Sequence, residues 1–336
     1  MHLPHFAASF ACVIMLMRFP ALAMDDGPAV RQVVDTPHWI WELKTAAPMR
    51  VLMLTNALAA RDAVEMAQRF DMAVDLVPVA PAEAKNRFDE VAFRAALARK
   101  PDILVLVASD VSADLSDSMK AVVRDAVRAG LRVAVFGRES QHAAAQAWFG
   151  AEKDLQMVTP DPFADLPAAH AGFRQQPVMQ VTRAGKGPVF LVKGAYDLHW
   201  TRFAAFVPFD LPREHERLSV EVDYAIAARA IHLAAGRAMP DAGAVTGASD
   251  AREAELHLRA NSTSRGATCT WWLHDARDGA CVRSGSAPLD DATTRIPLTH
   301  ACGGSYLLRW RADREGITVG WGAFPVGIPV TAGFEA

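Results

Sequence analysis

The sequence predicts an α/β protein in which a doubly wound, mostly parallel sheet is followed by a small all-β sandwich. Three observations support this. Apolar strand segments alternate with helical segments between residues 50 and 136, the pattern of a parallel sheet with helical crossovers. The run at 103–107 is apolar without interruption, as in a strand that is buried on both faces. After residue 250 the period shortens to strands separated by turns, which favours an antiparallel sandwich.

The first half of the chain reads as four strands and three helices. Apolar residues at helical spacing define each helix. Pro81 ends the second strand, Pro101 bounds the second helix and Gly130 ends the third helix. The elements expected, in chain order, are strand 50–55, helix 57–70, strand 73–79, helix 88–99, strand 102–107, helix 115–129 and strand 131–136.

The second half begins with a hairpin and a long helix. Strands 178–182 and 188–193 flank Gly185, Lys186 and Gly187, which read as a tight turn. The helix 218–235 ends at Gly236. A small-residue stretch with Gly and Pro at 238–250 is predicted to be a linker. The strands expected after it are 254–260, 268–273, 280–284, 306–310 and 317–323.

Composition limits the class of protein. A chain of 336 residues with 51% hydrophobic residues is long enough for about two packed domains. Its net charge of -3 and pI near 6.4 argue against general nucleic-acid binding. No cofactor is expected, because no complete cofactor motif occurs.

The first 23 residues resemble a signal peptide. An apolar run at 6–17 precedes Ala21, Leu22 and Ala23, which match a small-x-small cleavage site. An uncleaved anchor and a true start at Met24 are the alternatives. We therefore expect a periplasmic or secreted protein with no membrane span after this segment. The predicted organisation is signal peptide 1–23, lead-in segment 24–48, α/β domain 49–237, linker 238–250 and β-sandwich 251–331.

Three cysteines follow the predicted cleavage site: Cys269, Cys281 and Cys302. An exported protein can form disulfides, so two of these cysteines can pair and the third remains a free thiol. The sequence leaves open which pair forms, and three unpaired buried thiols are the alternative.

The α/β half resembles the class I glutamine amidotransferase-like superfamily, in particular its non-amidotransferase, flavodoxin-like branch. The resemblance is carried by the strand at 50–54, the helix and strand at 115–136, the hairpin at 185–190 and the late helix at 222–237. The segment 251–331 resembles an immunoglobulin-like β-sandwich. The resemblance implies a flavodoxin-like fold. It also implies that an active site, where one is present, lies at the turn after the strand at 131–136.

Active members of that superfamily carry a cysteine in a G-x-C-x-G turn. Here Gly137 matches the first glycine, Arg138 follows, and Glu139 stands at the nucleophile position, with Ser140 after it. The second glycine is missing. A carboxylate does not replace a thiolate in amide hydrolysis, so the resemblance implies no catalysis. Arg138 and Glu139 are then a surface ion pair and Ser140 a helix N-cap.

Four residues are candidates for ligand binding: Asp110, Glu139, Asp197 and His199. Each is expected after a strand, where the carboxyl ends of a parallel sheet gather functional groups. Asp110 belongs to a group of three aspartates with Asp114 and Asp117. These read as turn and cap residues at the start of a helix, so no metal is expected.

These features predict an exported, non-catalytic binding or accessory protein. Its ligand would be a carbohydrate or another protein. The adjacent Trp271 and Trp272 should point to opposite faces of a strand, and an exposed aromatic ring can stack on a sugar. The first alternative is a hydrolase of sugars or esters that uses Asp110 and Glu139. The second is a periplasmic small-molecule receptor, which would need a second α/β lobe.

Overall fold

The computed structural model describes most of the chain between residues 39 and 328. The described residues are 39–43, 45, 47–56, 60–79, 90–107, 115–137, 139–159, 161–163, 166, 177–193, 217–237, 246–250, 253–258, 265–289, 294–297 and 304–328. The predicted signal peptide and most of the lead-in segment lie outside this set.

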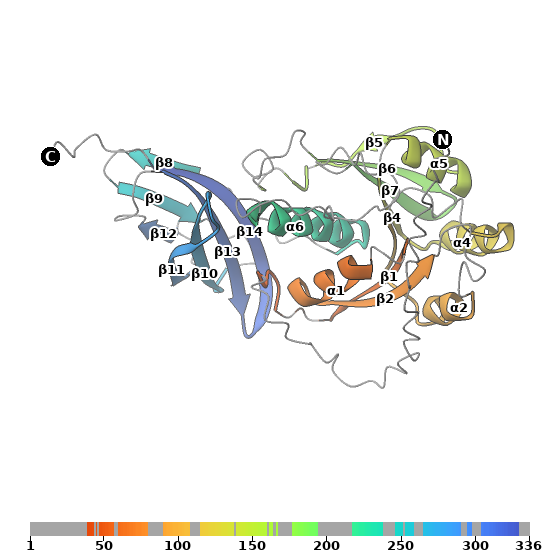
Figure 1. Ribbon diagram of the computed structural model, residues 1–336, viewed down its shortest axis with the longest axis horizontal. Helices are drawn as coiled ribbons and strands as arrows, with labels where there is room; N and C mark the ends of the chain where they lie inside the picture. Colours follow the sequence, from red (N-terminus) through yellow and green to blue (C-terminus); the bar gives the residue numbers. More distant parts are fainter. Residues whose placement is uncertain are drawn as a thin grey trace, which may run out of the picture. The chain divides into compact units, whose positions relative to one another are not determined.

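A mixed sheet of seven strands organises the first half of the chain (Figure 1). Its strand order is β2-β1-β3-β4-β7-β6-β5. Neighbours from β2 to β7 pair in parallel, whereas β6 and β5 are antiparallel. The strands are β1 (Met49–Asn56), β2 (Met72–Val79), β3 (Ile103–Val107), β4 (Val133–Phe136), β5 (Gln156–Met157), β6 (Val178–Ala184) and β7 (Gly187–Lys193).

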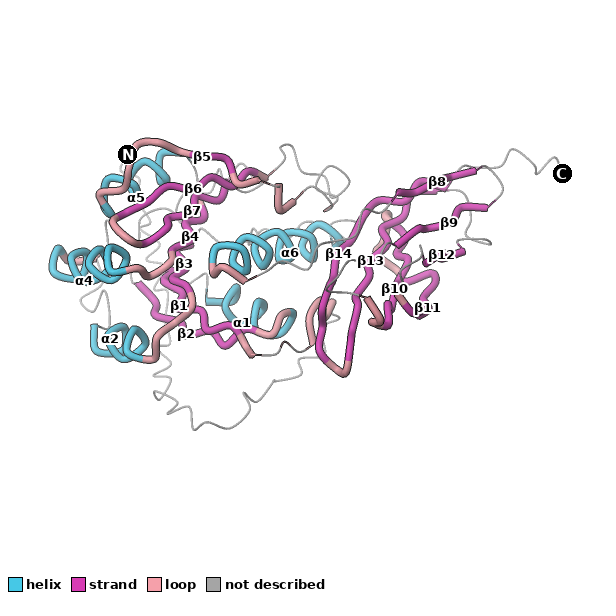
Figure 2. Tube along the Cα trace, turned by 180° about the vertical axis from the view of Figure 1, so that it is seen from behind, coloured by secondary structure: helices cyan, strands magenta, loops and turns pink. Residues whose placement is uncertain are grey.

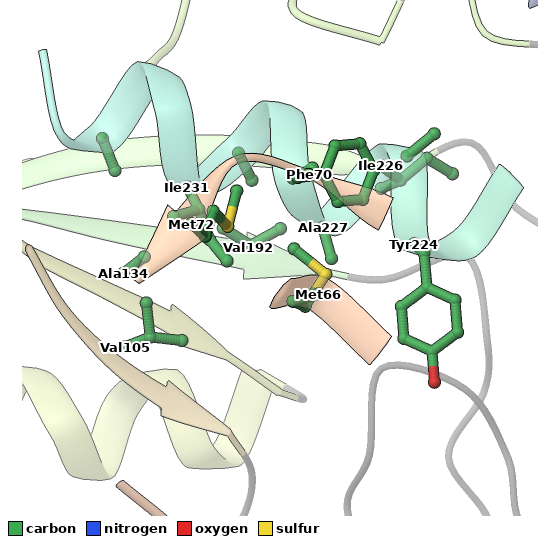
Figure 3. Packing of buried hydrophobic residues seen from close by; sticks show 14 of the residues in the cluster. Met66, Phe70, Met72, Val105, Ala134, Val192, Tyr224, Ile226, Ala227 and Ile231 are labelled. Atoms are coloured by element: carbon green, nitrogen blue, oxygen red, sulfur yellow. The ribbon is translucent and has the colours of Figure 1, made fainter. Parts of the chain in front are cut away.

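Helices cover both faces of this sheet, as predicted (Figure 2). Successive residues of a strand point to opposite faces. Val51 and Met53 therefore pack with α1 and α6, while Leu52 and Leu54 pack on the side of α2, α4 and α5. The helices are α1 (Ala60–Arg69), α2 (Glu90–Ala98), α4 (Asp117–Ala129), α5 (Glu139–Phe149) and α6 (Arg217–Ala234). Figure 3 shows the core that α1 and α6 share with the strands.

Local signals set several of these boundaries. The Ser116 hydroxyl accepts a hydrogen bond from the Met119 N–H at 3.3 Å and caps α4. Gly130 ends the same helix with φ 127°. The β6–β7 hairpin requires Gly187, because a Cβ atom there would lie 2.1 Å from the Val127 carbonyl oxygen. The hairpin turn is therefore packed tightly against the end of α4.

The C-terminal strands form antiparallel sheets, as predicted. A four-stranded sheet has the order β11-β10-β13-β14, and a three-stranded sheet has the order β12-β9-β8. The strands are β8 (Thr246–Asp250), β9 (Glu253–Leu258), β10 (Thr268–Asp275), β11 (Cys281–Pro288), β12 (Thr294–Pro297), β13 (Gly304–Arg314) and β14 (Ile317–Ile328). Strand β8 falls within the segment predicted to be a linker.

The end of the lead-in segment joins the two halves of the chain. Trp41 is buried in the α1/α6 core, and its backbone N–H donates to the Arg69 carbonyl at 3.0 Å. The Leu43 N–H donates to the Thr318 hydroxyl on β14 at 3.1 Å. Arg309 of β13 donates to the Ile40 carbonyl at 3.3 Å. The segment thus contacts both the α/β half and the C-terminal sheet.

Two of the three candidate cysteines are described, and both are free thiols. Cys269 is buried and Cys281 is exposed. Burial raises the pKa of Cys269 to about 12, with Asp313 adding to the effect. The two therefore do not pair with each other, and Cys302 lies outside the described residues.

Candidate functional site

The turn after β4 is partly described. Gly137 is buried, and its N–H donates to the Val192 carbonyl of β7 at 3.2 Å. Helix α5 begins at Glu139, whose side chain is exposed. Glu139 is therefore a carboxylate that faces solvent. Arg138 and the side chain of Ser140 lie outside the described residues, as do Asp110, Asp197 and His199.

His142 lies one turn further along α5 and is buried. Burial lowers the pKa of His142, and hydrogen bonds to the carbonyls of Val192 and Val135 only partly oppose this. The imidazole is therefore neutral at physiological pH. Glu139 stands one helical turn before His142, and its charge also opposes the lowering of the His142 pKa.

A second group of polar side chains lies where α1 meets α6. Helix α1 follows β1 and so begins at the carboxyl edge of the sheet. Helix α6 ends at the opposite edge, since the Arg132 side chain that precedes β4 donates to the Ala234 carbonyl at 3.1 Å. The start of α6 is therefore directed toward the carboxyl edge as well. We call this group the α1–α6 polar cluster; its members are Asp62, Glu65, Arg69, Glu221, Asp223 and Tyr224.

Arg69 holds one part of the cluster together. Its guanidinium makes two hydrogen bonds to the Glu221 carboxylate, at 3.0 and 2.8 Å, and it also pairs with Glu65. Both Arg69 and Glu221 are buried. Burial alone would lower the pKa of Arg69, but the charges and hydrogen bonds of Glu221 and Glu65 raise it. The guanidinium also lies 4.5 Å from the centre of the Tyr224 ring.

Asp62 and Asp223 form the other part. Asp62 is fully buried and accepts a hydrogen bond from the Tyr224 hydroxyl at 3.0 Å. Asp223 is 6% exposed, and its Oδ2 has no hydrogen-bond partner among the described residues. Burial raises the pKa of Asp223 well above its usual value, and the negative charge of Asp62 adds to this. Both effects favour the protonated form of Asp223.

Burial also raises the pKa of Tyr224, again with Asp62 contributing. The phenol therefore stays neutral and remains a donor to Asp62. Together these side chains bring two buried aspartates close to each other between α1 and α6. Within the described ranges, no group of three or more His, Cys, Asp or Glu is placed to hold a metal ion.

Replacing Asp223 with asparagine is expected to stabilise the protein more as the pH rises. The unfolded chain releases the Asp223 proton above about pH 4, whereas the folded protein retains it. Stability of the wild type therefore falls as the pH increases through this window. Urea unfolding should give nearly equal free energies of unfolding at pH 4 and a gain of about 1–3 kcal/mol for Asp223→Asn at pH 8.

The matched control is Asp117→Asn, because Asp117 is exposed in the first turn of α4. Its effect should stay within about 0.5 kcal/mol at both pH values. A destabilised Asp223→Asn at pH 8 would mean that Asp223 is ionised and paired in the folded protein.

The cluster was not predicted from the sequence, although its signal is present. Asp62, Glu65 and Arg69 share one face of α1, a pattern that usually marks a solvated surface. Glu221 and Asp223 stand in a helix whose residues 221–232 are all buried. Charges inside an otherwise apolar and fully buried helix must be satisfied by neighbours, so α6 required a charged partner.

Comparison with known proteins supplies no relative: no protein-family model matches the chain, and no curated protein matches it significantly in sequence. Among the described helices, none is both long enough and apolar enough to cross a lipid bilayer.

Proposed function

We propose that this protein is an exported, non-catalytic binding or accessory protein, with a carbohydrate or another protein as its ligand. It would consist of a degenerate amidotransferase-like domain and an immunoglobulin-like sandwich. The parallel order β2-β1-β3-β4-β7 is compatible with a flavodoxin-like domain, and the two antiparallel sheets are compatible with a sandwich.

The observation that carries the proposal is the β4–α5 turn. Catalysis in this superfamily depends on a thiolate at that turn, and here the position holds the exposed Glu139. The histidine nearest to it along the chain, His142, is buried away from solvent. A solvent-exposed carboxylate supplies no thiolate nucleophile for amide hydrolysis.

A hydrolysis assay tests this proposal. Purified protein should release no product above the buffer blank from a panel of p-nitrophenyl esters, p-nitroanilides and p-nitrophenyl glycosides between pH 5 and 8. The same panel is applied to Glu139→Ala, which should be indistinguishable from the wild type. An activity that the wild type shows and Glu139→Ala loses would establish the hydrolase alternative.

A further inference from the structure

Trp272 is a partly exposed aromatic residue on the four-stranded sheet, on the same face as Arg309 and Arg311. It lies on β10, next to Trp271, and the two point to opposite faces as predicted. Trp271 is buried in the core between β10, β13 and Leu289, whereas Trp272 is only half-buried. A partly exposed tryptophan on a sheet face presents apolar ring surface with a polar rim.

The ring is held in place from one side. The Arg309 guanidinium lies 3.9 Å from its centre, and Arg309 is itself buried and bonded to the Ile40 carbonyl. The same guanidinium lies 5.1 Å from the centre of the Trp39 ring. Burial lowers the pKa of Arg309 to about 10, so it remains charged. The stacking therefore fixes the orientation of the indole before any ligand arrives, and this reduces the entropy that binding must overcome.

The residues that pair with Thr270 and Trp272 on the adjacent strands are small or polar. On the edge strand β11, Ser284 lies directly opposite Trp272 and Ser286 opposite Thr270, and both serines are exposed. On β13, Arg311 lies opposite Thr270, and its Nε donates to Asp313 at 2.8 Å. Paired residues share a sheet face. Small serines leave room beside the ring, and hydroxyl, guanidinium and carboxylate groups stand around it.

This combination matches the chemistry of a sugar. One face of a pyranose ring is lined by C–H groups that stack on an aromatic surface, while its hydroxyl groups need donors and acceptors around the rim. Beside the ring, the exposed Ser284 and Ser286 and the partly exposed Arg311 and Asp313 supply such groups. We propose that Trp272, with Thr270, Ser284, Arg311 and Asp313, forms a binding site for a carbohydrate ring. The inference rests on the proposed binding function and gives it a location.

Affinity electrophoresis tests the site. Wild-type protein is run through native gels that contain xylan, mixed-linkage β-glucan, mannan or pectin, and at least one of these should retard it. Trp272→Ala should weaken the apparent affinity about tenfold or more, because it removes one aromatic stacking contact and the area buried by that contact. Trp272→Phe, which keeps an aromatic ring, should retain most of the retardation. Ser284→Leu, which fills the space beside an unchanged Trp272, should weaken it too.

Trp148→Ala is the matched control, because Trp148 is also a half-buried tryptophan but lies on α5. It should bind as the wild type does. Thermal unfolding identifies any variant that fails to fold. Ser284→Leu should fold normally, because it alters only an exposed side chain. Absence of retardation by all four polysaccharides, or equal retardation of Trp272→Ala and the wild type, would refute the site.

The two proposals fail separately. If the protein neither hydrolyses the assay panel nor binds the polysaccharides, the carbohydrate site is disproved and the proposed non-catalytic function stands. If the protein hydrolyses the panel and Trp272→Ala weakens polysaccharide binding, the proposed non-catalytic function is disproved and the carbohydrate site stands.

Discussion

Trp321→Ala is expected to lower the free energy of unfolding by about 3–5 kcal/mol, the usual cost of emptying a large buried aromatic site. Trp321 lies on β14 and is 3% exposed. Its ring centre is 5.4 Å from that of Trp41 and 5.3 Å from that of Phe70. The Arg229 guanidinium of α6 lies 5.0 Å from the Trp321 ring, and Arg229 donates to the Trp321 carbonyl at 2.9 Å.

The size of this effect follows from where Trp321 packs. It belongs to the same core as α1 and α6, so its removal weakens contacts between the C-terminal sheet and the α/β half. Guanidinium-induced unfolding, followed by circular dichroism, should show a single transition for the wild type. The midpoint of Trp321→Ala should lie at a lower guanidinium concentration than that of the wild type. Val91→Ala, at a residue that is 79% exposed, should change the midpoint little. Two separate wild-type transitions, with Trp321→Ala affecting neither, would contradict this prediction.

Glu221→Ala is expected to cost about 3 kcal/mol or more, because it leaves the buried guanidinium of Arg69 without its bidentate partner. Glu65 still pairs with Arg69, which keeps the loss near the lower end of the usual range. The double replacement of Arg69 by methionine and Glu221 by leucine should be more stable than Glu221→Ala alone, since no buried charge then remains unpaired.

The pair Glu90–Arg94 on α2 supplies the control. It too joins an arginine to a glutamate, at 2.6 Å and one helical turn apart, but both side chains are about half exposed. Glu90→Ala should therefore cost less than about 0.5 kcal/mol. Urea unfolding at pH 7 measures all variants. If Glu221→Ala and Glu90→Ala cost the same, the Arg69–Glu221 pair contributes no more than a surface ion pair.

The elements of the α/β half were predictable because their signals are local. The apolar run at 103–107 became β3, and Gly130 ends α4. The hairpin around Gly185 became β6 and β7. Periodicity and chain-breaking residues act within a few positions, so they identify elements without knowledge of the fold. The predicted ends differ from the observed ones by at most three residues, because helix ends fray and flanking turns extend strands.

The helix α5 and strands β8 and β12 were not predicted. Residues 139–149 mix Ala, Gln and His without a clear apolar stripe, so their helical conformation is decided by burial of Ala145 and Phe149 against the sheet. β8 and β12 have sequences of small or mixed residues, Thr246–Asp250 and Thr294–Pro297. They form strands through pairing with β9, and strand pairing is a long-range interaction that local propensity does not determine.

Sequence alone was enough for the alternation of strands and helices between residues 50 and 136, the change from α/β to all-β and the absence of a thiol at the β4–α5 turn. Each depends on residues that are neighbours along the chain. The α1–α6 polar cluster, the position of Trp321 in the core of the α/β half and the exposure of Trp272 rather than Trp271 were decided by tertiary structure. Asp62 and Tyr224 are 162 positions apart in the chain, and only the packing of α6 against α1 removes them from water and makes their charges and hydrogen bonds depend on each other.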